Sequence, residues 1–288
     1  MSISSRTPRR EQGFTLIELM ITLLVMAAVL GLVFFTLQRS QHQSARVTNV
    51  ADERQMARTA IQLIEREARM SGSGWGRTPV QGSRSGASWT LGALNPGFGS
   101  VNTSDSLTML GAWQASTALT DSMVSNSSNI VVTSTAGFTD GDLLLVTDQD
   151  NKSAHLFQAT SVNSGTRTLA HTGASTYNAG PFLGWPAGGY PIGSPVYKVT
   201  MSTYKFDSTT YRRPALLRRE AGKPWQIVAY NVDGFHVWYL LQDGTWTRNP
   251  ANMTMVDRVI PVVLTRLTDP RLPTLRDSVY ASVRPRTF

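Results

Sequence analysis

The stretch that decides the fold of this chain is Gly13-Phe14-Thr15-Leu16-Ile17-Glu18-Leu19-Met20, which opens a long apolar run. The apolar residues continue to Leu37, and no charged residue lies between Leu19 and Leu37. A helix over residues 14–37 would be about 36 Å long, enough to cross the roughly 30 Å hydrocarbon core of a bilayer with some tilt. We therefore predict a transmembrane helix over residues 14–37.

The segment before this run, residues 1–13, is polar and carries three arginines against one glutamate. Positive charge ahead of an apolar helix places the N-terminus in the cytoplasm and exports the rest of the chain. An ordinary secretory signal has an apolar region of about 7–15 residues with a small-residue cleavage site after it. This run is longer and no such site follows it, so an uncleaved anchor explains its length and orientation better.

Glu18 is the one residue that a plain anchor does not explain. A carboxylate in an apolar segment costs about 2.5–3.5 kcal/mol on insertion scales, so its presence points to a function. The alternative is that Glu18 lies near the membrane interface and extends its carboxylate into the headgroup region.

The basic leader, Gly13, Phe14 and the following Thr-Leu-Ile-Glu together resemble the class III signal of type IV prepilins and type II secretion pseudopilins. The resemblance implies that prepilin peptidase cleaves between Gly13 and Phe14, so that residues 1–13 are a cytoplasmic leader, and that the new amine of Phe14 is methylated. Glu18 would then lie one helical turn from a cationic amine, and in lipid the carboxylate gains most by pairing with such an amine, its own or a neighbour's. We expect Glu18 to set the position of an incoming subunit during assembly.

Residues 38–72 are predicted to continue the helix in amphipathic form, because residues 38–70 contain neither proline nor glycine. Glycines 72 and 74 are a predicted stop. Apolar residues recur along one face of this helix at helical spacing, and we expect that face to pack on the rest of the protein. These residues are Val50, Ala57, Ile61, Ile64 and Ala68.

Residues 73–288 are predicted to form a periplasmic β-rich head. Residues 73–102 and 171–195, rich in glycine and proline, are predicted loops. Strands are predicted at 107–113, 130–135, 143–147, 155–162, 196–206, 227–230, 235–241, 255–267 and 279–283. With the resemblance, this pattern predicts an α+β type IV pilin fold, a long N-terminal helix packed on an antiparallel β-rich head.

Four further segments narrow the resemblance to the PilW-type minor pilins. Residues 66–72, Arg-Glu-Ala-Arg-Met-Ser-Gly, are similar to the signature that ends the helix in that family. Residues 137–148 resemble its hairpin, with Gly-Asp before a strand and Asp after it. Residues 232–239 and 283–288 resemble its late aromatic strand and its C-terminal ending.

Enzymatic chemistry finds little support in the sequence. The chain has no cysteine, which excludes disulfides, thiolate zinc sites and thiol nucleophiles. No phosphate-binding loop, nucleophile elbow or zinc-protease motif occurs, and the four histidines are far apart: His42, His155, His171 and His236. We expect no enzyme activity, no cofactor and no metal.

The turn at Asp148, Asp150 and Asn151 offers alternate oxygen ligands, so calcium is an alternative there. Lys152 departs from the EF-hand pattern, and the glutamate that would complete it is missing. A solvated turn is the simpler interpretation.

The chain is basic, with 27 Lys and Arg against 19 Asp and Glu. Arginine clusters at 212–213, 218–219 and 284/286 would suit contact with DNA phosphates. No nucleic-acid-binding motif accompanies them, and solvated strand ends or subunit contacts explain them equally, so DNA binding is not expected.

The leading prediction is a PilW-like minor type IV pilin, a non-enzymatic subunit that primes or caps the pilus and supports its biogenesis and twitching motility. Its expected partners are other minor and major pilins through the N-terminal helix, prepilin peptidase, the inner-membrane assembly platform and membrane lipid. The predicted location is the inner membrane, with the N-terminus cytoplasmic and the head periplasmic, and then the pilus on the cell surface. A J-type pseudopilin of type II secretion and a DNA-uptake competence pilin are the alternatives.

Overall fold

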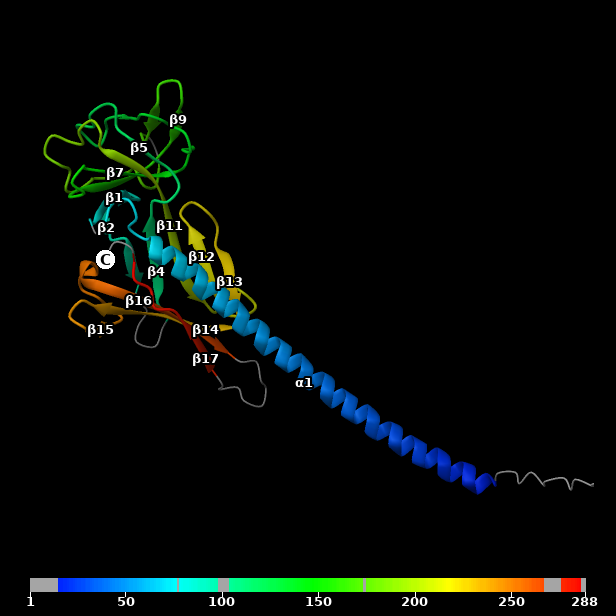
Figure 1. The fold of residues 1–288 in the computed structure, drawn as a ribbon. Helices are drawn as coiled ribbons and strands as arrows, with labels where there is room; N and C mark the ends of the chain where they lie inside the picture. Colours follow the sequence, from blue (N-terminus) through cyan, green and yellow to red (C-terminus); the bar gives the residue numbers. More distant parts are fainter. Residues whose placement is uncertain (1–14, 77, 98–103, 173–174, 267–275, 286–288) are drawn as a thin grey trace, which may run out of the picture. The chain divides into compact units, whose positions relative to one another are not determined.

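The computed structural model describes residues 15–76, 78–97, 104–172, 175–266 and 276–285. One long helix, α1 (Leu16–Met70), precedes a series of β-strands that form three sheets (Figure 1). The predicted α+β class, a long N-terminal helix followed by antiparallel-rich sheets, is confirmed. By its internal contacts the chain divides into two units, Met1–Ala51 and Asp52–Phe288, so that the boundary falls inside α1.

The first unit contributes the N-terminal part of α1. The helix begins at Leu16 and passes Gly31 without a break, and it is long and apolar enough to cross a membrane. The predicted helix over 14–37 is therefore confirmed from Leu16 onward. Gly13 and Phe14 lie outside the described residues.

In the second unit, the C-terminal part of α1 buries one face. Ala57, Ala60, Ile61, Ile64 and Ala68 are all at most 3% exposed and belong to one core with strand residues of the head. The predicted apolar face is thus confirmed for residues 57–68. Its spacing of three and four residues is that of a helix that packs along one side.

Helix α1 ends at Met70, just before the two glycines that predicted its end. Gly72 has a φ of 74°, a left-handed conformation that glycine adopts without strain. Its N–H donates to the carbonyl of Leu110 at 2.9 Å, which fixes the turn against the sheet.

The largest sheet has ten strands and centres on the long strand β11. β11 pairs antiparallel with β4, β5, β7 and β12 along its length, and β1 pairs parallel with β8. The strands are β1 (Val80–Arg84), β2 (Ala87–Leu91), β3 (Leu94–Gly97), β4 (Ser106–Gly111), β5 (Ser116–Ala118), β7 (Leu143–Thr147), β8 (Ala154–Gln158), β11 (Pro195–Asp207), β12 (Ala215–Glu220) and β13 (Gln226–Tyr230).

Two smaller sheets complete the second unit. A three-stranded sheet has the order β6-β10-β9, and a four-stranded sheet has the order β15-β14-β16-β17. Their strands are β6 (Ile130–Val131), β9 (Ser161–Asn163), β10 (Thr168–Ala170), β14 (Val232–Leu241), β15 (Trp246–Thr247), β16 (Val256–Arg266) and β17 (Arg276–Tyr280). A short 3-10 helix, Met253–Met255, precedes β16.

Several strand predictions need correction. The predicted loop over 73–102 is wrong in its middle, where β1, β2 and β3 form; β1 and β2 are a hairpin in which Trp89 lies opposite Gly82, and a Cβ at Gly82 would come within 3.1 Å of the indole. The predicted strand 155–162 splits into β8 and β9. Strands β5, β10, β12 and β15 were not predicted, because they are short or carry polar residues on one face and depend on pairing with partners distant in sequence.

Candidate functional site

The start of α1 is organised around Glu18. Its carboxylate Oε2 accepts hydrogen bonds from the Thr15 backbone N–H at 3.2 Å and from the Thr15 hydroxyl at 3.0 Å. In return, the Glu18 N–H donates to Thr15 Oγ1 at 3.4 Å. This reciprocal pattern is a capping box, with Thr15 as N-cap and Glu18 at the third helical position.

The sequence analysis did not predict this role for Glu18, although the spacing Thr15-x-x-Glu18 is its signature. The capping role also gives Glu18 a fixed direction: its carboxylate lies back toward the residues that precede the helix. No basic side chain of the described residues pairs with it.

The helix that follows Glu18 exposes apolar side chains on every side. Leu16 is 80% and Leu24 72% exposed, and no large apolar residue from Leu16 to Leu37 is less than 48% exposed. The polar groups within the run are satisfied inside the helix, since Thr22 donates to the Glu18 carbonyl and Thr36 to the Val33 carbonyl. A surface of this kind finds no partner within its own unit and is suited to lipid or to other apolar helices.

A comparison with protein families finds a known motif in this part of the chain. The family model described as the prokaryotic N-terminal methylation motif matches residues 8–34. This match supports a type IV pilin-like protein. No curated protein and no solved structure matches it.

For this pilin-like protein, the motif implies processing by prepilin peptidase and partners of the pilus-assembly type. The apolar helix and the motif together indicate membrane anchoring. The matched residues include Gly13 and Phe14, the predicted cleavage site, which lie outside the residues that the structure describes. The predicted roles of Gly13, Phe14 and Glu18 remain predictions.

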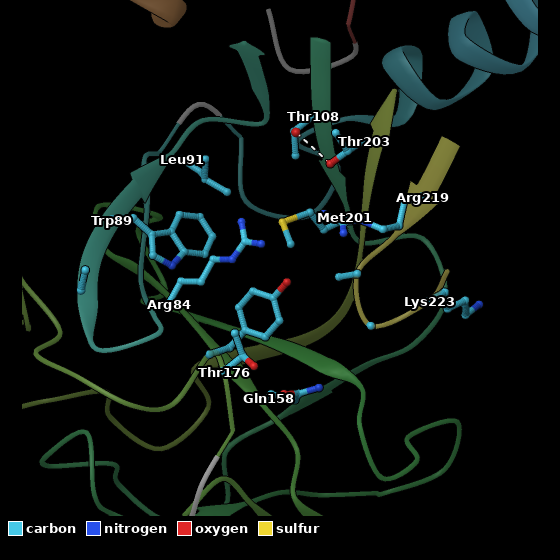
Figure 2. Close-up of a pocket in the computed structure, with 14 residues that line it drawn as sticks. Arg84, Trp89, Leu91, Thr108, Gln158, Thr176, Met201, Thr203, Arg219 and Lys223 are labelled. Carbon is cyan, nitrogen blue, oxygen red and sulfur yellow. Dashed lines mark hydrogen bonds between the residues drawn. The ribbon is translucent and has the colours of Figure 1, made fainter. Parts of the chain in front are cut away.

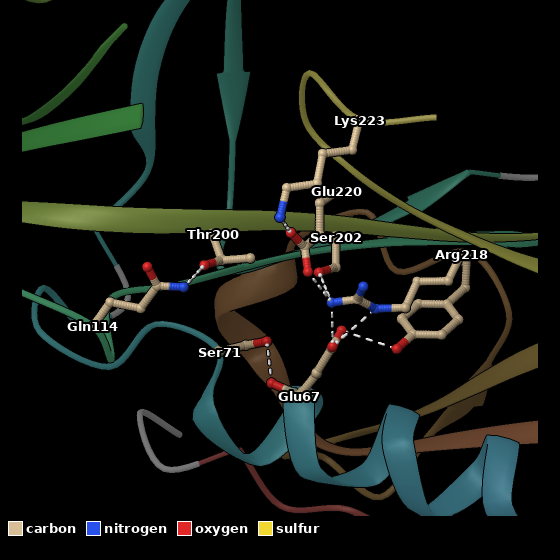
Figure 3. Close-up of polar contacts among 9 residues, drawn as sticks. Glu67, Ser71, Gln114, Thr200, Ser202, Arg218, Glu220 and Lys223 are labelled. Atoms are coloured by element: carbon tan, nitrogen blue, oxygen red, sulfur yellow. Dashed lines mark hydrogen bonds and ion pairs between the residues drawn. The ribbon is translucent and has the colours of Figure 1, made fainter. Parts of the chain in front are cut away.

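A buried ionic group fastens the end of α1 to the large sheet (Figure 3). Glu67, one of the buried acidic residues, accepts from Arg218 Nε at 3.0 Å and Nη2 at 2.7 Å on one oxygen, and from the Tyr204 hydroxyl at 3.0 Å on the other. Burial raises the pKa of Tyr204, and the nearby Glu67 charge raises it further, so the phenol remains a hydrogen-bond donor. The Glu67 side chain therefore has a cationic donor at one oxygen and a neutral donor at the other, and both oxygens are satisfied.

Arg218 has further partners on its own sheet. It donates to Glu220 Oε1 at 2.8 Å and to the Ser202 hydroxyl at 3.1 Å. Burial alone would lower the pKa of Arg218, but the hydrogen bond and charge of Glu67, together with the hydrogen bond to Glu220, raise it above its usual value. Glu220 is in turn paired with Lys223, and that hydrogen bond is the main cause that lowers the pKa of Glu220.

Residues 137–148, which were predicted to resemble a hairpin, contain the single strand β7; its antiparallel hairpin partner is β8, and aspartates hold the turns at both ends of β7. Asp142 Oδ2 accepts from the Thr139 N–H at 2.6 Å and pairs with Lys198 Nζ at 2.8 Å. Asp148 Oδ1 accepts from the Lys152 N–H at 2.6 Å. These two residues flank β7, whose five residues are all buried.

In the turn considered for calcium, Lys152 Nζ lies 2.9 Å from Asp150 Oδ2. Among the described residues there is no group of three or more acidic or histidine ligands that could hold a metal ion. Asp150 and Lys152 form an exposed ion pair.

Three of the histidines are held by neighbours within the second unit. His155 contacts the Tyr190 hydroxyl at 2.5 Å and the Leu183 carbonyl at 2.8 Å, and His171 contacts the Asn126 carbonyl at 2.8 Å. Burial lowers the pKa of both, and of His236 beside Arg248. Each ring therefore favours its neutral form.

The arginine clusters that were considered for DNA have contacts of their own. Arg218 is committed to Glu67, the guanidinium carbon of Arg219 lies 4.5 Å from the centre of the Trp225 ring, and Arg284 pairs with Asp257 at 2.9 Å. Arg212 and Arg213 are exposed, and Arg286 lies outside the described residues.

Proposed function

We propose that this protein is a non-enzymatic minor pilin of the PilW type, a membrane-inserted subunit that primes or caps a type IV pilus and supports its biogenesis and twitching motility. In this proposal prepilin peptidase removes residues 1–13, and the helix from Phe14 passes from the inner membrane into the filament. Its head is periplasmic before assembly and lies on the cell surface afterwards.

The observation that carries the proposal is the single carboxylate at the head of an apolar helix that is exposed all around. Glu18 is oriented toward the helix start by Thr15, the direction in which a processed N-terminal amine would lie. A carboxylate in lipid gains most from a cationic partner. Pairing with the Phe14 amine of a neighbouring subunit would give assembly a fixed axial step.

The PilW assignment is supported by the physical roles of the residues that suggested it. Glu67 binds the end of helix α1 to the sheet, and Asp142 and Asp148 stabilise the turns before and after β7. The alternative of a DNA-uptake subunit is favoured less, because Arg218 and Arg284 already have acidic partners. The J-type pseudopilin remains an outcome of the test below.

The first experiment is deletion of the gene, followed by counts of surface pili and by assays of twitching, protein secretion and DNA uptake. The proposal expects loss of pili and twitching with secretion intact. Loss of secretion with normal pili would assign the chain to a secretion pseudopilus instead.

The second experiment separates the two roles of Glu18. Glu18→Gln keeps a capping-box residue but removes the charge, whereas Thr15→Ala removes the hydroxyl of the cap and keeps the charge. We expect both variants to be processed and inserted, because apolar length and the flanking arginines are unchanged. Thr15→Ala should enter sheared pili, whereas Glu18→Gln should do so poorly and Glu18→Ala more poorly still.

A subunit at the very tip has no subunit ahead of it and would not need its own glutamate. Normal piliation with Glu18→Ala would therefore mean either the terminal position or a wrong pairing model. Crosslinking to filament neighbours separates these outcomes, since a tip subunit is crosslinked on one side alone.

A further inference from the structure

The second unit contains a cavity of about 580 Å³ that the proposed assembly role does not use (Figure 2). Its floor is the face of β4, β11 and β12, with Thr108, Met201, Thr203 and Arg219. The β1–β2 hairpin supplies one wall, with Arg84, Trp89 and Leu91, and the segment of Thr176 and Tyr177 supplies another. The volume lies within the range of about 300–1,000 Å³ that is usual for small-molecule sites.

Hydrogen bonds hold the walls of this cavity together. The Ser85 N–H donates to the Thr176 carbonyl and the Gly86 N–H to the Ala179 carbonyl, both at 2.8 Å, so the hairpin is tied to the segment that carries Tyr177. That segment is tied in turn to β8, since the Gln158 N–H donates to Asn178 Oδ1 at 2.8 Å. The cavity is therefore formed before any ligand arrives, which lowers the entropic cost of binding.

Two guanidinium groups lie at the cavity without acidic partners. Among the residues that the structure describes, neither Arg84 nor Arg219 pairs with a carboxylate, and the residues that line the cavity include no Asp or Glu. The third cation, Lys223, is already paired with Glu220. In Figure 2 the Arg84 side chain extends between Trp89 and Met201.

Arg84, Tyr177 and Arg219 line the same cavity. Burial raises the pKa of the Tyr177 hydroxyl, and the charges of Arg84 and Arg219 both act in the opposite direction. The guanidinium carbon of Arg219 also lies 4.5 Å from the centre of the Trp225 ring, over which Lys205 Nζ lies as well. Two oriented guanidinium groups beside a phenol form a receptor for a planar oxyanion, because the fork of N–H donors matches carboxylate geometry.

The remaining surface of the cavity is suited to a ring. Trp89, Leu91 and Met201 give it an aromatic and apolar side, and the hydroxyls of Thr108 and Thr203, 2.9 Å apart, give its floor a polar site. The face of a ring can pack on the indole and the thioether while its charged substituent reaches the arginines.

We propose that this cavity binds a small organic anion in which a six-membered ring carries a carboxylate. An aromatic acid and a sugar acid both have this chemistry, and the proposal does not depend on the role of α1 in assembly.

The test uses the full chain in lipid nanodiscs, with para-fluorobenzoate as the probe and empty nanodiscs as the blank. Fluorine NMR line broadening should show binding of para-fluorobenzoate, with the neutral para-fluorobenzamide at least about 10-fold weaker, as expected when charge-assisted hydrogen bonds are lost. Arg84→Gln and Arg219→Gln should each weaken binding of the benzoate by about 10-fold or more. Arg212→Gln, which removes the same charge from an exposed residue that does not line the cavity, should leave binding unchanged.

Displacement of the probe then identifies the ring. Displacement by glucuronate at lower concentration than by acetate assigns the cavity to sugar acids, and failure of glucuronate with intact benzoate binding assigns it to aromatic acids. Equal binding of the benzamide, equal displacement by acetate, or insensitivity to both cavity arginines would overturn the proposal.

Discussion

The two parts of helix α1 have similar helical geometry and opposite surroundings. From Leu16 to Leu37 the large apolar side chains are all exposed, whereas from Ala57 to Ala68 the apolar residues of one face are buried. Both parts carry apolar residues, but the first has them all around the helix and the second on one face. The distribution of apolar residues around the helix, rather than their presence, decides whether they find partners within the chain or outside it.

The polar residues of the two parts differ in the same way. The Glu67 carboxylate has Arg218 and Tyr204 as partners in its own unit, whereas the Glu18 carboxylate is hydrogen-bonded, among the described residues, only to Thr15 at the start of the same helix. The Glu67 carboxylate completes the fold, and the Glu18 carboxylate is, in our proposal, left for an intermolecular contact. Substitutions in the two parts should therefore have separate consequences.

The largest expected effect on folding follows from removal of Arg218. Arg218→Leu leaves the buried Glu67 carboxylate with Tyr204 alone, and loss of one partner of a buried pair costs about 3–5 kcal/mol. Urea unfolding of the detergent-solubilised chain, followed by tryptophan fluorescence, measures the change. Arg212→Leu, at an exposed position, is the matched control.

The double substitution Glu67→Leu with Arg218→Leu sharpens this result. It removes the unpaired charge along with its partner, so it should be more stable than Arg218→Leu alone. A double variant that is less stable than the single one would show that Glu67 does not depend on Arg218.

Ile64→Ala should be the next most damaging change. Ile64 is fully buried in the core that α1 shares with the strands, and such truncations cost about 2–5 kcal/mol. Leu24→Ala removes comparable apolar volume from a side chain that is 72% exposed, and the unfolding midpoint of the head should not change. Equal destabilisation by both substitutions would abolish the distinction between the two parts of the helix.

A smaller expected effect is a dependence of the stability of the second unit on pH. The pKa values of His155 and His171 are lowered by burial, so the unfolded chain binds protons more readily. The stability that these neutral rings contribute is complete above the unfolded pKa of about 6.5 and is lost as the pH falls below it. Urea midpoints measured from pH 7.5 to 5 should decline, and less so in His171→Phe.

His42 supplies the control for this prediction, since it lies in the first unit and is exposed. His42→Gln should leave the decline unchanged. A flat pH profile of the unmodified protein would contradict the assignment of neutral buried histidines.

The sequence predicted those elements whose signal is local. The apolar run after Glu18, the face at Ala57–Ala68, the glycine stop and the strand β7 were all readable because each depends on nearby residues. β1 and β2 were missed because the hairpin depends on the fit of Trp89 over Gly82 and on parallel pairing of β1 with β8.

The candidate functional site could be predicted from the sequence only where its signal is local. The class III signal and Glu18 stand out in the chain, but the partner of Glu67 lies 151 residues away and nothing in the local sequence indicates it. The cavity is a further case, since Arg84, Tyr177 and Arg219 come from three segments that are distant in sequence and are brought together only in the folded head.

The central claim is that the exposed part of α1 becomes an intermolecular surface after processing of a class III signal. The most direct measurement is mass spectrometry of the N-terminal peptide of the membrane-extracted protein. The account predicts a peptide that begins at Phe14 and carries one added methyl group on its amine. An intact leader, or cleavage after the apolar run, would contradict it.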